Sequence, residues 1–123
     1  MDLRIAGRRA IVCAASKGLG RACAMALAEN GVDLVVNARG EEALQATARD
    51  IRERFKVEVE AVAADITTPD GRASVLAACP DPDILVNNAG IPDAQRAHKM
   101  PVELIDRVLD INVRAPFILA CEV

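Results

Sequence analysis

A short run of small residues near the start of the chain has the composition of a phosphate-binding turn. It follows an apolar stretch and reads Ala14-Ala15-Ser16-Lys17-Gly18-Leu19-Gly20. Small side chains let backbone N–H groups approach a pyrophosphate at the N-terminus of the helix that follows. We therefore expect a phosphate site at Ala14, Ser16, Lys17, Gly18, Leu19 and Gly20. Similar turns occur in α/β proteins that bind no nucleotide, so the turn alone leaves both alternatives open.

A basic residue stands where a dinucleotide site would read the ribose. Arg39 follows Gly20 by about 20 residues, and a residue at that distance contacts the ribose 2′ position. An acid there binds a free 2′-hydroxyl, whereas an arginine suits a 2′-phosphate. Lys17 adds a second cation, so the pattern predicts NADP(H) in preference to NAD(H). The alternative is a solvated arginine at the end of a strand.

Polar and small residues follow two further apolar stretches. Asp65-Ile66 follows one of them, and Asp65 suits either an adenine amino group or a cap on local backbone N–H groups. Asn87-Asn88-Ala89-Gly90 follows the other, where small residues leave room for a ribose and asparagine bonds the local chain. The alternative is an ordinary turn rich in asparagine. We expect five of these residues to border the cofactor: Asp65, Ile66, Asn88, Ala89 and Gly90.

The elements that must position these residues alternate between strand and helix. The predicted strands span 10–14, 33–38, 57–63 and 83–87, and the predicted helices span 18–30, 41–55, 69–78 and 101–123. This β-α-β-α-β-α-β-α order predicts an α/β fold, a Rossmann-type doubly wound parallel sheet with strand order 3-2-1-4. Ligand is expected at the switch between the first and fourth strands. Residues 88–100 are expected to form a polar loop.

Taken together, these residues resemble the N-terminal half of the short-chain dehydrogenase/reductase family, close to its β-ketoacyl-ACP reductase type. The resemblance rests on residues 13–20, for the family's T-G-x-x-x-G-x-G, and on Asp65, residues 87–90 and Ile111-Asn112-Val113. It implies NADP(H)-dependent hydride transfer between a nicotinamide and a small-molecule carbonyl or alcohol, with 3-oxoacyl thioesters as candidates. It also implies a homo-oligomer that associates through the last helix.

One catalytic residue of the family has a counterpart in this sequence. Asn112 matches the asparagine of the family's Asn-Ser-Tyr-Lys set. The resemblance implies that the main-chain carbonyl of this asparagine holds a water in the proton relay. In an α-helix the carbonyl of Asn112 would accept a bond from the N–H of residue 116. Residue 116 is a proline, which has no N–H to donate. A helix broken there would leave that oxygen open to water, and the alternative is a simple kink around a buried asparagine.

The sequence also departs from the family pattern. Cys13 and Ala14 replace the threonine and the first glycine. Because a left-handed backbone costs a residue with a Cβ about 1–2 kcal/mol, we expect ordinary dihedral angles at Ala14.

The rest of the family's catalytic set is absent from these residues. The chain has no tyrosine, and it ends in an apolar stretch that has no helix stop signal. We therefore expect residues 1–123 to be one truncated nucleotide-binding domain of an oxidoreductase. The alternative is a nucleotide-binding fragment without catalysis.

Composition excludes several other classes. A net charge of −3 and an aromatic content of 2% argue against nucleic-acid binding, and no run has the length of a membrane span. A cytoplasmic protein is therefore expected. The four cysteines form no C-x-x-C pair, so we expect small buried hydrophobes and no metal site. Gln95, Arg96 and His98 could border the substrate pocket, or they could be solvated loop residues.

Overall fold

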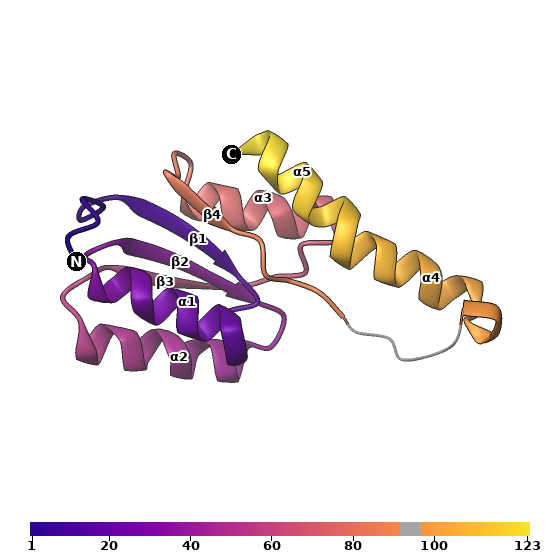
Figure 1. Ribbon diagram of the computed structural model, residues 1–123, viewed down its shortest axis with the longest axis horizontal. Helices are drawn as coiled ribbons and strands as arrows, with labels where there is room; N and C mark the ends of the chain where they lie inside the picture. The colour runs from indigo at the N-terminus through magenta and orange to yellow at the C-terminus, as the bar shows by residue number, and fades with distance from the viewer. Residues whose placement is uncertain (92–96) are drawn as a thin grey trace.

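The computed structural model, which describes residues 1–91 and 97–123, shows a four-stranded sheet between helices (Figure 1). The strands are β1 (Arg9–Cys13), β2 (Asp33–Ala38), β3 (Val59–Ala63) and β4 (Ile84–Val86). The helices are α1 (Gly18–Glu29), α2 (Glu41–Arg54), α3 (Pro69–Ala78), α4 (Val102–Leu109) and α5 (Ala115–Glu122). All three strand pairs are parallel, and the order is β3-β2-β1-β4. The predicted doubly wound topology is confirmed.

Alternate residues of the strands face two separate cores. Ala10 and Val12 of β1 pack with Leu44 and Ile51 of α2 in one buried cluster. Ile11 and its partners on the opposite side of the sheet pack with α3 and α5 in another. Successive side chains of a strand point to opposite faces, which explains why a nearly continuous apolar strand needs helices on both. Figure 1 shows α1 and α2 below the sheet and α3 and α5 above it.

Several predicted boundaries shift by one or two residues: two strands begin beside a carboxylate that accepts a backbone N–H, and one strand ends at a sharp turn. β3 begins at Val59 instead of residue 57, and the Asp33 carboxylate accepts the N–H of Glu58 at 2.9 Å. β4 begins after Asp83, whose carboxylate accepts the N–H of Arg9 at 3.0 Å. β1 ends at Cys13, one residue before the predicted end, because the chain turns sharply at the next residue.

Residues 102–122 form one long helical rod. A 3₁₀ turn, η1 (Ala97–Lys99), leads to α4, and α4 continues through the π-helical segment η2 (Asp110–Arg114) into α5 (Figure 1). Pro101 caps the rod with an extended backbone, so the helix begins one residue later than predicted. The Ala115 N–H bonds the Asp110 carbonyl, five residues earlier, which is the spacing of a π-turn.

The predicted break near Pro116 is thus a π-helical widening within a continuous rod. Within the residues that the structure describes, no helix combines the length and the apolar character that a membrane crossing needs.

Candidate cofactor-binding site

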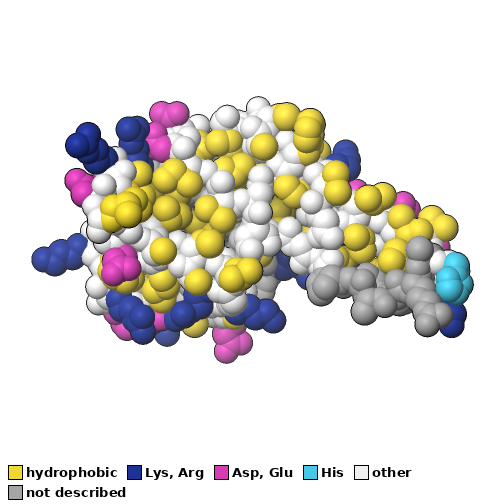
Figure 2. Space-filling view, in the orientation of Figure 1, with side chains coloured by type: hydrophobic (Ala, Val, Ile, Leu, Met, Phe, Trp, Pro, Cys, Tyr) yellow, Lys and Arg dark blue, Asp and Glu magenta, His cyan; other side chains and the backbone are white. Residues whose placement is uncertain are grey.

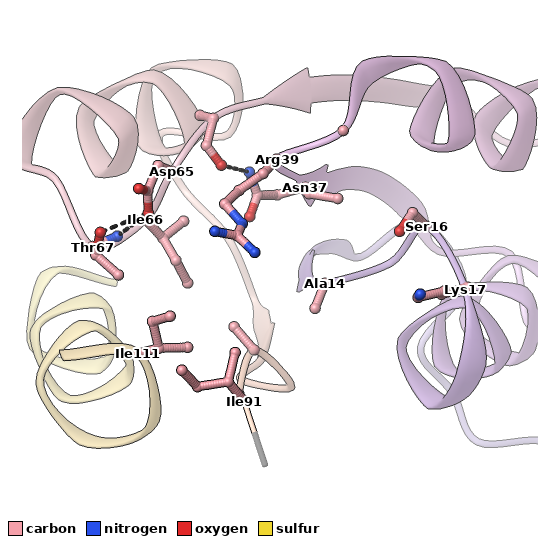
Figure 3. A pocket seen from close by; sticks show the side chains of 15 residues that line it. Ala14, Ser16, Lys17, Asn37, Arg39, Asp65, Ile66, Thr67, Ile91 and Ile111 are labelled. Atoms are coloured by element: carbon pink, nitrogen blue, oxygen red, sulfur yellow. Dashed lines mark hydrogen bonds between the residues drawn. The ribbon is translucent and has the colours of Figure 1, made fainter. Parts of the chain in front are cut away.

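A cleft of about 310 Å³ opens at the carboxyl end of the strands, above the turn that follows β1. Figure 3 shows side chains from several elements pointing into it, with Ile66, Ile91 and Ile111 together on one side and Ser16 and Lys17 on the other. Eight residues of the predicted site line the cleft: Ala14, Ser16, Lys17, Arg39, Asp65, Ile66, Ala89 and Gly90. Its volume lies at the lower end of the range for small-molecule sites.

The turn after β1 contains a strained alanine. Ala14 has φ +53°, so the expectation of ordinary dihedral angles is wrong. Two neighbours hold it in place. Asn88 Nδ2 donates to the Ala14 carbonyl at 3.3 Å, and a Cβ built on Gly20 would lie 2.0 Å from the same oxygen. Gly20 and Asn88 therefore support the turn from outside the cleft, and packing against them maintains a conformation that costs Ala14 about 1–2 kcal/mol.

The N-terminus of α1 has no protein cap in the described residues. Lys17 stands at the N-cap with an extended backbone, its side chain forms no capping hydrogen bond, and the first turn carries no acid. By contrast, Thr68 caps α3 by accepting the Gly71 N–H at 3.0 Å. The first N–H groups of an uncapped helix remain available to an anion, and the helix dipole favours negative charge at this end. The geometry therefore fits the pyrophosphate of a dinucleotide.

The cleft carries two exposed cations. Arg39 follows β2 and Lys17 lies in the turn, and neither forms an ion pair within the part of the chain that is described. In Figure 3 the Arg39 guanidinium lies over the cleft, between Asp65 and Lys17. Asp65 lines the same cleft, and within the described residues it forms no ion pair with either cation, so both remain available to an anionic ligand.

Asp65 is held by its own loop. Its Oδ1 accepts the Thr67 N–H at 3.0 Å and the Thr67 hydroxyl at 2.7 Å. These bonds, and more weakly the charge of Arg39, lower the pKa of the Asp65 carboxyl below its usual value. Of the two predicted roles the local cap is therefore present, and the contact with adenine stays a prediction.

Asn112 contacts the loop after β4 through its side chain. Its Oδ1 accepts the Ile91 N–H at 2.9 Å, and its Nδ2 donates to the Ile91 carbonyl at 3.0 Å. Gly90 packs so close that a Cβ there would lie 2.8 Å from Asn112 Oδ1. Asn112 is outside the cleft lining, whereas its neighbour Ile111 is inside it. The water-binding role of the Asn112 carbonyl stays a prediction.

Sequence reasoning named some residues that lie outside the lining and missed others within it. Five predicted residues support or flank the cleft without lining it: Gly18, Leu19, Gly20, Asn88 and Asn112. Seven residues line it that were not assigned to the site: Asn37, Ala38, Gly40, Ala64, Thr67, Ile91 and Ile111. Asn37 could have been noticed in the sequence, because it is a polar residue between the apolar run 34–36 and Ala38 of the same strand. It is buried, and its Nδ2 donates to the Val62 and Ala64 carbonyls at 2.9 and 3.1 Å.

The structure describes some of the predicted substrate-pocket residues and all four cysteines. His98 is exposed in η1, and Gln95 and Arg96 lie outside the described residues. Across the ranges 1–91 and 97–123 no group of His, Cys, Asp or Glu could hold a metal. Cys13 is buried, which raises the pKa of its thiol to about 11, whereas Cys121 is exposed, contrary to expectation.

An uncapped helix N-terminus over a doubly wound parallel sheet, with two cations at the same cleft, defines a dinucleotide-binding class of protein. The short chain dehydrogenase family model matches residues 8–123 of this chain. The chain belongs to that family.

Individual relatives agree with this assignment. The chain is 33% identical over 115 residues to a 3-oxoacyl-(acyl-carrier-protein) reductase of Rickettsia bellii, covering 94% of this chain and 46% of that protein. An L-sorbose reductase from Gluconobacter frateurii, solved with NADPH and L-sorbose, superposes with TM-score 0.95 at 33% identity, over 100% of this chain and 48% of that chain.

A short-chain dehydrogenase from Sphingobium yanoikuyae, solved with NADPH, gives TM-score 0.86 at 34% identity, over 94% of this chain and 47% of that chain. The chain spans about half the length of the curated relatives it matches.

Proposed function

We propose that this chain binds NADP(H) in the cleft and prefers it to NAD(H). The observation that carries the proposal is the pair of exposed cations, Arg39 and Lys17, at one cleft. The open N-terminus of α1 receives the pyrophosphate, and Arg39 with Lys17 receives the 2′-phosphate. The NADPH complexes of two similar structures support this choice of cofactor.

Titration of the 123-residue chain with NADPH and NADH, followed by nicotinamide fluorescence, tests the proposal. We expect tighter binding of NADPH. Arg39→Ala should remove most of the preference, because a charge-assisted bond to phosphate contributes about 1.5–3 kcal/mol. Arg49→Ala is the matched control, since Arg49 is an exposed arginine on α2 outside the cleft lining. Tighter binding of NADH, or equal loss in both variants, would contradict the proposal.

We propose further that the bound cofactor serves hydride exchange with a small-molecule carbonyl or alcohol. The nicotinamide supplies the hydride chemistry, and the protein orients the cofactor and its substrate. Asn112 fixes the backbone at Ile91, and Ile91 lines the cleft. The name of the Rickettsia relative favours 3-oxoacyl thioesters as the first substrates to test. NADPH consumption with a 3-oxoacyl thioester and with a simple ketone is the measurement.

A second candidate function is nucleotide binding without turnover. It is favoured by the composition, because the sequence contains no tyrosine to act as the general acid that the family resemblance implies. The same assay separates the two candidates. Tight NADPH binding together with no ketone-dependent oxidation by this chain supports the binding module, and measurable turnover rejects it.

We also propose that the rod is an association surface between copies. Leu109, Val113 and Phe117 are all more than half exposed along it. Figure 2 shows hydrophobic side chains along the part of the molecule that projects from the sheet. Sedimentation velocity of wild type and Phe117→Ser provides the test. A smaller species in the variant is expected, and identical monomeric profiles would contradict the proposal.

A further inference from the structure

We propose that Thr47 of α2 is a positioning residue for recognition of the 2′-phosphate, acting through the Ser16–Lys17 peptide. This inference rests on the proposed NADP(H) site. Thr47 is only 3% exposed, yet its hydroxyl belongs to no helix cap. Its Oγ1 donates to the Ser16 carbonyl at 2.9 Å, a bond that joins a helix to the phosphate turn.

The bond fixes the peptide that leads into Lys17. The Ser16 carbonyl and the Lys17 N–H share one planar unit, so holding the carbonyl also sets the start of Lys17. Threonine suits this task because its branched Cβ leaves few rotamers on a helix. The nearest other backbone bonds are those from the Ala15 N–H to Asn37 and from Arg21 to the Lys17 carbonyl. Neither of them holds the Ser16 oxygen.

Helix α2 connects the two cations, because Arg39 closely precedes it and Thr47 on it bonds the turn that carries Lys17. Arg39 lies just before α2 begins at Glu41, and Thr47 lies on that helix. One turn further on, Asp50 pairs with Arg21 of α1. A helix is rigid over this length, so the position of Lys17 relative to Arg39 depends on how α2 holds the turn. Both cofactors carry the pyrophosphate and only NADPH carries the 2′-phosphate, so an error in this spacing should weaken NADPH binding more than NADH binding.

The experiment compares Thr47→Val with Thr47→Ser by NADPH and NADH titration and by thermal melting without ligand. Valine keeps the shape and removes the donor, and serine keeps the donor. For Thr47→Val we expect NADPH binding to weaken about fivefold, the effect of one lost hydrogen bond, and NADH binding to change less than twofold. Thr47→Ser should retain the wild-type ratio of affinities.

The matched control is Asp50→Asn, which removes the charge that pairs with Arg21 of α1 and Arg54 of α2 and leaves the Thr47 bond intact. It should lower the melting temperature and leave the NADPH-to-NADH ratio unchanged. Equal weakening of both cofactors by Thr47→Val shows a purely structural role and overturns the inference, as does no change at all. A wild-type chain that binds neither cofactor, or both equally, overturns the proposed function and this inference with it. A wild-type preference that Thr47→Val leaves intact overturns the inference alone.

Discussion

The two ends of this chain use helices differently. In the region from β1 to α2, each helix buries residues against the sheet, such as Ala24 on α1 and Leu44 on α2. In the rod, α4 buries none of its residues 102–109, and Leu109 remains 51% exposed. Amphipathic helices therefore build the cofactor cleft where a sheet covers their apolar faces. Where nothing covers them in the described structure, they present an open apolar surface.

This difference decides which residues can form a precise site. The turn after β1 is held by the buried side chain of Thr47 and by contact with Gly20, so its backbone is fixed from several sides. The rod contributes one lining residue, Ile111, which is buried at the base of the π-segment. We therefore expect substitutions in the first region to act on both folding and cofactor binding, and substitutions on α4 to act on neither.

The largest expected effect is a matched pair of leucine truncations. Leu44→Ala removes a fully buried side chain and should lower the free energy of unfolding by about 3 kcal/mol through lost burial and a cavity. At a concentration at which the chain sediments as a monomer, Leu109→Ala removes a half-exposed side chain from a helix surface and should change this free energy by less than about 0.5 kcal/mol. Urea denaturation followed by circular dichroism measures both.

A comparable loss in the two leucine variants would break the comparison between the regions. It would mean that Leu109 is covered within the single chain, because sedimentation of the same samples excludes cover by the proposed association between rods.

The second effect concerns the close contact beneath the phosphate turn. Gly20→Ala places a Cβ 2.0 Å from the Ala14 carbonyl, which is backbone and must shift. We expect a loss of about 2 kcal/mol from overpacking, together with loss of NADPH binding. Gly40→Ala is the control for stability alone, because Gly40 also lines the cleft but a Cβ there meets nothing within 4 Å and its φ is −82°. If Gly20→Ala binds NADPH like the wild type, the turn does not hold the cofactor.

A smaller gain is expected from relieving the strain at Ala14. Ala14→Gly allows φ +53° without a Cβ penalty and should stabilise the fold by about 1 kcal/mol, partly offset by greater freedom in the unfolded chain. Thermal melting measures the change. A lower melting temperature in Ala14→Gly would show that contacts of the methyl group outweigh the strain.

The topology was predictable from sequence because each strand and helix carries its own periodicity. The bounds of β2 are those expected, and Thr68 caps α3 with Pro69 at the first helical position as expected. Ala14 and Asn37 are two positions whose structural roles the local sequence pattern did not predict. Local sterics favour ordinary dihedral angles at Ala14, yet its φ is +53° in the fold, where Gly20 lies close to its carbonyl and Asn88 bonds that carbonyl.

Partners that lie far away in the sequence explain the remaining gaps in the predicted site. Asn37 bonds carbonyls on β3, and Thr47 bonds the turn before α1, so neither partner is visible in the local pattern. Ile91 and Ile111 look like ordinary apolar residues in the sequence, and only the fold brings both of them to the lining of the cleft.

The smallest expected effect is a pH dependence confined to one loop of the cleft. The bonds from Thr67 lower the pKa of Asp65 in the folded chain, so they stabilise the fold above the unfolded pKa of about 4. This contribution is lost as the pH falls through the folded pKa. Thr67→Val removes the hydroxyl bond and keeps the N–H bond, and it should raise the pKa of Asp65 in a carboxyl NMR titration.

Asp83 provides an internal control in the same spectra. Its pKa is lowered mainly by the Arg9 N–H at the opposite end of the sheet, so Thr67→Val should leave it unchanged. Because Asp65 is exposed to solvent, the accompanying change in stability should be small and limited to pH values below about 4. A pKa of Asp65 that is equal in wild type and Thr67→Val would show that the Thr67 hydroxyl bond does not persist in solution. The loop bordering the cleft would then be less rigid than the turn opposite it.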